Sequence, residues 1–217
     1  MSVTRHRTDM APVDPRLLER WRRIPVSVAV DLAPEHQIDP LVRPLRPAGQ
    51  QPALFGRAVT VRCAPPDFGA VVQVLGLVQA GEVLVIDAGG SAACAMIGDV
   101  LGGHLHARGV AGIVCDGAVR DVGELAGMAG FSVFARHVNP KGPRSAADGE
   151  IGAPVSIGGR PVAPGDLIIG DDDGLAALPP DALALHIEAA EAKLALEAVW
   201  RARLAAGDTV SDIFGLP

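Results

Sequence analysis

The chain of 217 residues contains no tyrosine, and aromatic residues make up 3% of it. Proteins that hold single-stranded nucleic acids stack the bases on aromatic side chains, so this composition argues against such a function. The chain also has no cluster of basic residues, and its formal net charge is −6. This charge argues against nucleic acids or anionic membrane surfaces as the main partner.

Cysteines are few and separate. The chain has three, Cys63, Cys94 and Cys115, and no C-x-x-C motif, which is typical of a reduced compartment. The N-terminus is charged and interrupted by proline, unlike a signal peptide, and no hydrophobic run has the length of a membrane span. We therefore expect a soluble, cytoplasmic protein.

Lysine occurs at two positions, Lys141 and Lys193. A Schiff-base enzyme needs a desolvated lysine with a lowered pKa. Lys141 lies in a loop rich in proline and glycine, and Lys193 lies on a charged helix flank, so we expect neither side chain to be buried. Chemistry on a carbonyl group would then require a metal ion as the Lewis acid.

Several common active-site and metal-binding motifs are also missing. The sequence has no G-x-S-x-G, P-loop or G-x-G-x-x-G motif. His104 and His106 are two residues apart on an expected helix, so they point to different faces and are interpreted as surface or rim histidines. The acidic run at 171–174 lacks the alternate spacing of an EF-hand loop and is interpreted as a turn before a strand.

At 217 residues the chain is long enough for one well-buried α/β domain, or at most two small ones, and its hydrophobic content of 49% excludes disorder of the whole chain. Runs rich in β-branched residues predict strands over residues 56–63, 82–87, 110–115 and 131–134. Helices are expected between them, over residues 68–80, over 99–108 and up to about residue 128. Strands that alternate with helices in this way indicate a parallel sheet built from βαβ units.

The N-terminal part of the chain shows weaker patterns. Residues 1–12 are expected to form a disordered tail, so the predicted domain covers residues 13–217. A helix of about two turns is expected to begin at Asp14-Pro15. Residues 34–52 are polar and rich in proline, and are expected to form a long loop.

The C-terminal part predicts a hairpin-rich β layer over 155–170 and a long helix over 181–205. The apolar stripe of this helix consists of Leu183, Ile187, Ala190 and Leu194. Glu197 lies about 40° from the centre of that stripe. Its carboxylate either pairs with Arg201 one turn further along the helix or enters the site of a neighbouring subunit.

The most informative stretch runs from residue 98 to residue 121. A helix is expected to begin at residue 98 after a loop, and the free N–H groups at a helix start suit a small anionic ligand. The strand at 110–115 is expected to end in a polar turn over 116–121, which places Arg120 beside Asp121. The guanidinium of Arg can bind a carboxylate through two parallel hydrogen bonds, and the carboxylate of Asp is a hard oxygen ligand for Mg²⁺.

These two segments also have simpler interpretations. Gly98 before Asp99 is typical of an ordinary helix start, and Arg120 with Asp121 is typical of a solvated ion pair in a turn. However, consecutive βα loops open on the same edge of a parallel sheet, where ligand sites of α/β folds are found. We therefore predict a site for a small keto acid held on a metal ion.

The same stretch resembles a known family. Gly98-Asp99-Val100-Leu101, A-R-G-V-A-G at 107–112 and D-G-A-V-R-D at 116–121 are similar to motifs of the RraA-like family, and most closely to its 4-hydroxy-4-methyl-2-oxoglutarate aldolases. Further agreement comes from P-G-D at 164–166, G-D-D-D-G at 170–174 and the charged C-terminal helix. The similarity covers roughly residues 20–217.

The resemblance implies a swivelling β/β/α-type fold in a single domain, assembled as trimers or hexamers with sites between subunits. It also implies a class II aldolase that uses Mg²⁺ or Mn²⁺. Such an enzyme cleaves 4-hydroxy-2-oxo acids, such as 4-hydroxy-4-methyl-2-oxoglutarate, to pyruvate and a second oxo acid. Oxaloacetate decarboxylation is expected as an accompanying activity.

The resemblance also implies roles for individual residues. The backbone expected to bind the pyruvyl carboxylate is that of Gly98, Asp99, Val100 and Leu101. Arg120 is expected to contact the keto oxygen, Asp121 to ligate the metal, and Asp99 to help hold a catalytic water. A glutamate from the C-terminal helix of the adjacent subunit aligns best with Glu197, with Glu191 as the alternative.

Two features separate this chain from many members of the family. It has Gly98-Asp99 where they have Gly-Glu, and Gly103-His104 where they have small residues. These differences are expected to alter which substrate is accepted beyond its pyruvate part. The family also contains RraA itself, a non-catalytic inhibitor of an RNA-degrading endonuclease, so a protein-binding regulator of ribonuclease activity is the alternative function.

Overall fold

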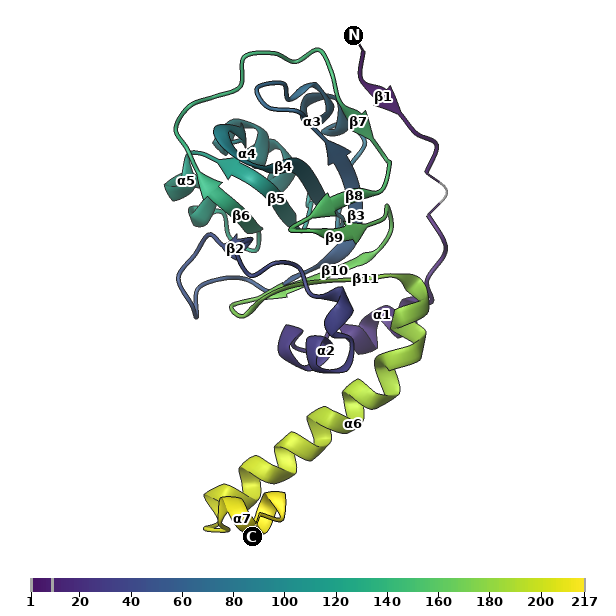
Figure 1. The fold of residues 1–217 in the computed structure, drawn as a ribbon, viewed down its shortest axis with the longest axis vertical. Coiled ribbons are helices and arrows are strands. Elements are labelled where there is room, and N and C mark those ends of the chain that lie inside the picture. Colours follow the sequence, from purple (N-terminus) through teal and green to yellow (C-terminus); the bar gives the residue numbers. More distant parts are fainter. Residues whose placement is uncertain (1, 9, 217) are drawn as a thin grey trace.

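The centre of the molecule is a parallel sheet whose strands are connected by helices (Figure 1). The computed structural model describes residues 2–8 and 10–216. The parallel strands lie side by side in the order β3 (Leu54–Arg62), β4 (Val83–Ile97), β5 (Gly112–Val119) and β6 (Ser132–Val138). Between them run α3 (Gly69–Val74), α4 (Asp99–Ala107) and α5 (Val122–Gly127). The predicted βαβ alternation is therefore confirmed.

Helices α3, α4 and α5 cover one face of this sheet. Val74 of α3, Leu105 of α4 and Leu125 of α5 are fully buried in one hydrophobic cluster with Ile86 and Ile113 of the strands. Burial of an aliphatic side chain contributes about 1.5–3 kcal/mol to the free energy of unfolding. This cluster therefore fixes the start of α4 relative to the ends of the strands.

The opposite face carries a second β layer, which confirms the predicted hairpin-rich segment. Strands β8 (Val155–Ile157) and β9 (Arg160–Val162) form one hairpin, and β10 (Leu167–Asp171) and β11 (Gly174–Leu178) form another. The acidic run at 171–174 forms the turn of the second hairpin, as predicted. Strand β10 also pairs antiparallel with the first half of β3, so β3 belongs to both layers.

The remaining helices pack on the second hairpin. The N-terminal helices are α1 (Pro15–Trp21), α2 (Val26–Leu32) and the 3₁₀ helix η1 (Pro34–His36). The C-terminal helices are α6 (Pro180–Ala205) and α7 (Val210–Phe214). Trp21 is buried with Leu183, Ile187 and Ala190 of α6, so the predicted apolar stripe is confirmed.

Helix α6 is much longer than its packed part. Figure 1 shows its C-terminal half projecting away from the sheet, with α7 folded back at the far end. Within the described part of the chain, no helix combines the length and the hydropathy needed to cross a membrane.

Two segments expected to lack regular structure form short edge strands. Strand β1 (Thr4–Arg5) pairs parallel with β7 (Glu150–Ile151), which in turn pairs antiparallel with β3. The disordered tail predicted over residues 1–12 is therefore wrong at residues 4 and 5, because backbone pairing orders a segment without hydrophobic periodicity. Within the expected loop over 34–52, β2 (Arg43–Pro44) pairs with β6. Residues 1, 9 and 217 of the predicted tail and domain lie outside the described residues.

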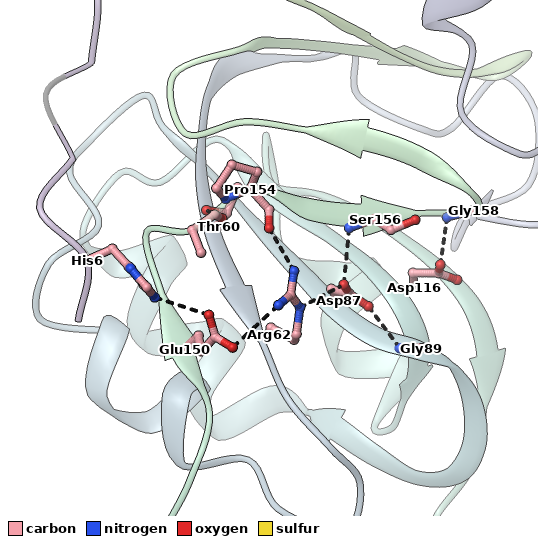
Figure 2. Close-up of polar contacts among 11 residues, drawn as sticks. His6, Thr60, Arg62, Asp87, Gly89, Asp116, Glu150, Pro154, Ser156 and Gly158 are labelled. Atoms are coloured by element: carbon pink, nitrogen blue, oxygen red, sulfur yellow. Dashed lines mark hydrogen bonds and ion pairs between the residues drawn. The ribbon is translucent and has the colours of Figure 1, made fainter. Parts of the chain in front are cut away.

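Strands β4 and β5 are longer than the sequence predicts. The expected turn at 88–91 lies inside β4, and the first four residues of the expected turn at 116–121 lie inside β5. Strand β4 continues past Asp87 through register shifts opposite β5. Asp87 and Asp116 are cross-strand neighbours and both are buried. Figure 2 shows how their carboxylates are satisfied by the β8–β9 hairpin: Asp87 accepts the amide of Ser156 at 3.1 Å, and Asp116 that of Gly158 at 2.6 Å.

Helix α3 ends earlier than expected, because the chain turns at residues 75–77 instead of continuing as a helix to residue 80. The positive φ of Gly81 still marks the predicted stop before β4.

Candidate active site

A pocket of ≈ 410 Å³ lies where β4 ends and α4 begins. Its walls include Phe68 and Val72 from the start of α3, residues 95–101, Arg120, and the pair Gly142 and Pro143. The segment predicted to bind a carboxylate, Gly98 to Leu101, and the predicted guanidinium of Arg120 are therefore brought together in one cavity. This confirms that the two loops open on the same edge of the sheet.

Gly98 precedes the first residue of α4, and its carbonyl oxygen accepts the amide of Gly102 at 2.9 Å, which starts the helix. A side chain is excluded at this position, since a Cβ atom on Gly98 would lie 2.3 Å from Oδ2 of Asp121 and 2.9 Å from Cγ of Arg120. The absence of a Cβ atom therefore lets the two predicted site residues lie against the start of α4.

Asp121 has a backbone conformation that is uncommon for residues other than glycine. Its φ of 54° makes it the one non-glycine residue with positive φ in the described part of the chain. This left-handed conformation turns the carboxylate toward α4, where Oδ2 accepts the backbone N–H of Asp99 at 3.3 Å and the Nε–H of Arg120 at 3.2 Å. Strained backbone of this kind clusters at functional sites.

The electrostatics of the site are dominated by two acidic side chains and one basic one. Partial burial acts to raise the pKa of Asp121, but hydrogen bonds from the backbone and side chain of Asp99 and the charge of Arg120 outweigh it and hold the pKa below its ordinary value. Asp99 Oδ1 also accepts the amide of Val100 at 2.8 Å. Acidic side chains therefore already engage the amides of Asp99 and Val100 at the helix start.

The donor set fits a hard divalent cation. In residues 2–8 and 10–216, no group of three or more His, Cys, Asp or Glu side chains has an arrangement that could hold a metal. Mg²⁺ does not need such a cluster, because it commonly binds one or two carboxylates and keeps several waters. Asp121 and Asp99 place two carboxyl groups within hydrogen-bonding reach of each other, an arrangement that a cation between or beside them would stabilise.

The segment 139–148, which we call the strap, forms a wall that the sequence did not predict. A Cβ atom on Gly142 would lie 2.7 Å from Nη1 of Arg120, so the strap backbone packs directly against the guanidinium. At one end the strap is tied to β4, where the carbonyl of Lys141 accepts the amide of Ala95 at 2.8 Å. At the other end Asp67 accepts the amides of Ala147 and Asp148, each at 3.0 Å. The sequence shows Gly142 only as part of a Pro/Gly loop and gives no signal that this loop reaches Arg120.

The two candidate glutamates lie on α6, whose projecting half points away from α4 within one chain (Figure 1). The side chain of Glu197 is 26% exposed and forms an ion pair with Arg201 at 3.4 Å. Within a single subunit, Glu197 therefore makes the pair one turn along the helix, which was the first of the two alternatives for this residue. Glu191 accepts two hydrogen bonds from Arg20, at 2.8 and 2.6 Å. Arg20 of the same chain therefore holds the Glu191 side chain, whereas Glu197 lies in the half of the helix that projects.

The lysines and histidines behave as expected. Lys141 is exposed, and Lys193 forms an ion pair with Asp31. His104 is exposed, and His106 lies within hydrogen-bonding distance of the carbonyl of Ala129, at 3.0 Å. None of these side chains belongs to the described lining of the pocket.

Comparisons with known proteins show which proteins this chain resembles. A Thermus thermophilus protein named 4-hydroxy-4-methyl-2-oxoglutarate aldolase is 36% identical over 149 residues, which cover 69% of this chain and 88% of that protein. A Halalkalibacterium halodurans protein that carries the same name provisionally is 32% identical over 170 residues, or 78% of this chain and 80% of that protein.

Solved structures share the fold. An uncharacterized Pseudomonas syringae protein superposes with a TM-score of 0.81 at 20% identity, over 98% of this chain and 99% of that chain. A Thermus thermophilus protein described as the RNA-processing inhibitor RraA gives a TM-score of 0.63 at 33% identity, over 71% of this chain and 92% of that chain. The model of the RraA-like family, described as Aldolase/RraA, matches residues 28–176. The chain therefore belongs to the RraA-like family.

Proposed function

We propose that this chain is a divalent-metal-dependent lyase. It would cleave 4-hydroxy-2-oxo acids, such as 4-hydroxy-4-methyl-2-oxoglutarate, to pyruvate and a second oxo acid, and would decarboxylate oxaloacetate. The observation that carries the proposal is the convergence of Arg120 and the left-handed Asp121 on the start of α4 beside a pocket of ≈ 410 Å³. The aldolase names of relatives at 32% and 36% identity support it.

The chain's own residues account for substrate orientation and charge stabilisation. The start of α4 would receive the pyruvyl carboxylate, which displaces the Asp99 side chain from the amide of Val100. Arg120 would face the C2 keto oxygen and stabilise the negative charge that develops on it. Mg²⁺ or Mn²⁺, held by Asp121, would supply Lewis-acid polarisation of that oxygen.

The bond changes are the same in both reactions. In retro-aldol cleavage the electrons of the C3–C4 bond move onto the C2 oxygen to give the pyruvate enolate, and the C4 hydroxyl proton passes to a water held by Asp99. In oxaloacetate the C3–C4 bond also breaks, and the C4 carboxylate leaves as carbon dioxide. The enolate then takes a proton at C3 to become pyruvate.

The proposal includes a contribution from a second subunit. Glu197, on the projecting half of α6, would enter the site of a neighbouring copy in a trimer or hexamer and share in proton transfer. Glu191 is held by Arg20 of its own chain, which favours Glu197 for this role.

The test is pyruvate release from oxaloacetate and from 4-hydroxy-4-methyl-2-oxoglutarate. We expect release that stops with EDTA and returns with Mg²⁺ or Mn²⁺. Arg120→Ala should abolish turnover and leave the oligomer intact, whereas Arg108→Ala, an exposed arginine outside the pocket lining, should behave as wild type. Near-wild-type turnover in Arg120→Ala would contradict the site assignment.

A ribonuclease regulator is the second candidate, favoured by the 33% identity to the Thermus protein described as an RNA-processing inhibitor. A regulator of this kind needs no metal and no pocket chemistry. Inhibition of an RNA-degrading endonuclease by the wild-type chain, together with no metal-dependent pyruvate release, would favour this function over the lyase.

A further inference from the structure

We propose that Asp67 is a positioning residue for the reaction: it holds the strap against the Arg120 guanidinium and acts on catalysis through that contact. The inference rests on the proposed lyase function and deepens it, because Asp67 lies outside the described pocket lining. The juxtaposition behind it is one carboxylate that bonds both the start of α3 and the strap, two segments that form walls of the pocket.

The Arg120 guanidinium depends on the strap for its position. The side chain is 41% exposed, and among the residues that the structure describes the guanidinium has one hydrogen-bond partner, Asp121, which accepts Nε–H at 3.2 Å. At the far end of the group, a Cβ atom on Gly142 would lie 2.7 Å from Nη1. An arginine side chain has many rotamers, so entropy favours its release wherever packing does not hold it. The strap therefore supplies the packing that holds the Nη end.

Backbone hydrogen bonds fix the strap within two residues of Gly142 on both sides. On one side the carbonyl of Lys141 accepts the amide of Ala95 in β4 at 2.8 Å. On the other side the amide of Arg144 donates to the carbonyl of Pro66, just before α3, at 3.0 Å. The position of the strap beside the guanidinium is therefore set by the segment that leads into α3.

The Asp67 carboxylate joins that segment to the strap a second time. Its Oδ1 accepts the amide of Gly69 in α3 at 2.8 Å and that of Asp148 in the strap at 3.0 Å. Its Oδ2 accepts the amide of Ala147 at 3.0 Å, and the side chain of Ser145 donates a further hydrogen bond. Each hydrogen bond of this kind shifts the equilibrium between a held and a released strap by about tenfold or more.

The competing explanation is that Asp67 only stabilises the fold. Asp171→Ala is the matched control for this explanation. The carboxylate of Asp171 also accepts two backbone amides, of Val26 at 2.9 Å and of Asp173 at 3.0 Å, and the residue lies outside the described lining of the site. Both alanine variants should lower the thermal unfolding midpoint, but only the Asp67 variant should impair catalysis.

The kinetic test is exchange of the pyruvate methyl protons with deuterated water in the presence of Mg²⁺, at a temperature where circular dichroism shows every variant folded. Asp67→Ala should lower kcat about 100-fold and keep KM within about twofold, because a misplaced Arg120 loses stabilisation that arises only in the transition state. Asp171→Ala should keep the wild-type kcat. An unchanged kcat in Asp67→Ala, a loss confined to KM, or equal losses of kcat in both variants would overturn the inference.

Two further variants keep the inference testable if Asp67→Ala does not fold. Asp67→Asn retains an oxygen that can accept the amides of Gly69 and Asp148, so its kcat should be at least about tenfold above one-hundredth of the wild-type value. Gly142→Ala leaves Asp67 in place but must part the strap from Nη1 by about 0.7 Å to reach the ordinary 3.4 Å, so it should lower kcat at least about tenfold. A wild-type kcat in Gly142→Ala would overturn the inference.

A double variant tests whether Asp67 acts through the guanidinium. In Arg120→Lys the charge remains, but the Nη1 atom that the strap holds is absent. Asp67→Ala should therefore lower the residual kcat of Arg120→Lys by less than about threefold, because the two changes remove the same interaction. A further loss of about threefold or more would show that Asp67 acts independently of Arg120.

Modification of Arg120 by phenylglyoxal separates failure of this inference from failure of the proposed function. The reagent attacks the Nη atoms, and mass spectrometry of the peptide that contains Arg120 gives the rate. We expect the rate to rise about tenfold in Asp67→Ala and to stay at the wild-type value in Asp171→Ala. That result, with no metal-dependent proton exchange in the wild type, would refute the lyase function alone. An unchanged rate in Asp67→Ala would refute the coupling of Asp67 to Arg120, whatever the activity.

Discussion

Gly98 and Asp121 are packed so closely that a Cβ atom on Gly98 would lie 2.3 Å from Oδ2 of Asp121. The φ of Gly98 is −144°, which any residue can adopt, so only the close approach requires glycine here. The contact joins the start of α4 to the end of β5, and it sets the position of the carboxylate proposed to hold the metal.

Gly98→Ala should therefore impair activity with little change in fold. To reach an ordinary contact the Asp121 carboxylate must move by about 1 Å, and a displacement of that size costs about 100-fold in rate. The control is Gly103→Ala, whose Cβ would meet Met128 at an ordinary 3.5 Å. The measurement is kcat/KM for pyruvate release; equal activity in the two variants would contradict the account.

Asp121→Asn should weaken metal binding without unfolding the chain. Asn tolerates the left-handed conformation and can still accept the amide of Asp99, but it removes the negative charge. We expect the affinity for Mn²⁺, followed by electron paramagnetic resonance, to fall at least about tenfold. Asp173→Asn, in the exposed β10–β11 turn, removes the same charge elsewhere and should leave the affinity unchanged. Equal affinities in wild type and Asp121→Asn would refute the ligand assignment.

Two of the glutamates of α6, Glu191 and Glu197, should give different phenotypes. Glu197→Gln should lower kcat about 100-fold while the thermal unfolding midpoint stays close to that of wild type. Glu191→Gln should instead lower the midpoint and leave kcat unchanged, because Glu191 is bound by Arg20 of its own chain. The opposite pattern would make Glu191 the residue that reaches the neighbouring site.

Much of the fold could be predicted because the apolar residues recur with the period of a strand in the strands and with the period of a helix in the helices. The parallel strands, the helices between them and the stripe of α6 follow from that pattern. The ends of β4 and β5 do not, because Asp87 and Asp116 resemble turn residues until the hairpin amides of Ser156 and Gly158 satisfy them. Pairing of β1 with β7 is likewise a contact between distant segments that leaves no local signal.

In the site, too, some residues could be predicted from local sequence and others depend on contacts between distant segments. Arg120 and Asp121 are adjacent in sequence and follow a buried strand, so their position could be predicted. The contributions of Gly142 and Asp67 could not, since they depend on where the strap crosses the pocket. The bulky wall of Phe68 and Val72 was also missed, because a short helix start gives no sign of which cavity it faces.

Asp67 anchors the strap, and we expect it to make the free energy of unfolding depend on pH in the acid range. Partial burial acts to raise the pKa of Asp67, but hydrogen bonds from the Ser145 side chain and from the amides of Gly69, Ala147 and Asp148 outweigh it and hold the pKa at about 2, against an ordinary 3.8. The carboxylate therefore stabilises the fold above pH 3.8, and this contribution is lost as the pH falls through about 2.

Asp67→Asn should lower the free energy of unfolding by about 1–2 kcal/mol at neutral pH. The difference from wild type should shrink as the pH falls from 4 to 2, because the wild-type carboxylate then takes up a proton. Urea unfolding at a series of pH values measures both effects. A difference that stays constant down to pH 2 would contradict the role of the ionised carboxylate.

The most direct test of the lyase site follows the methyl protons of pyruvate in deuterated water by NMR, in wild type and Arg120→Ala. Exchange requires the enolate that both proposed reactions share, without any choice of leaving fragment. We expect rapid exchange with Mg²⁺ or Mn²⁺, and loss of that exchange with EDTA or in Arg120→Ala. Exchange that persists in EDTA, or that Arg120→Ala retains at the wild-type rate, would contradict the account.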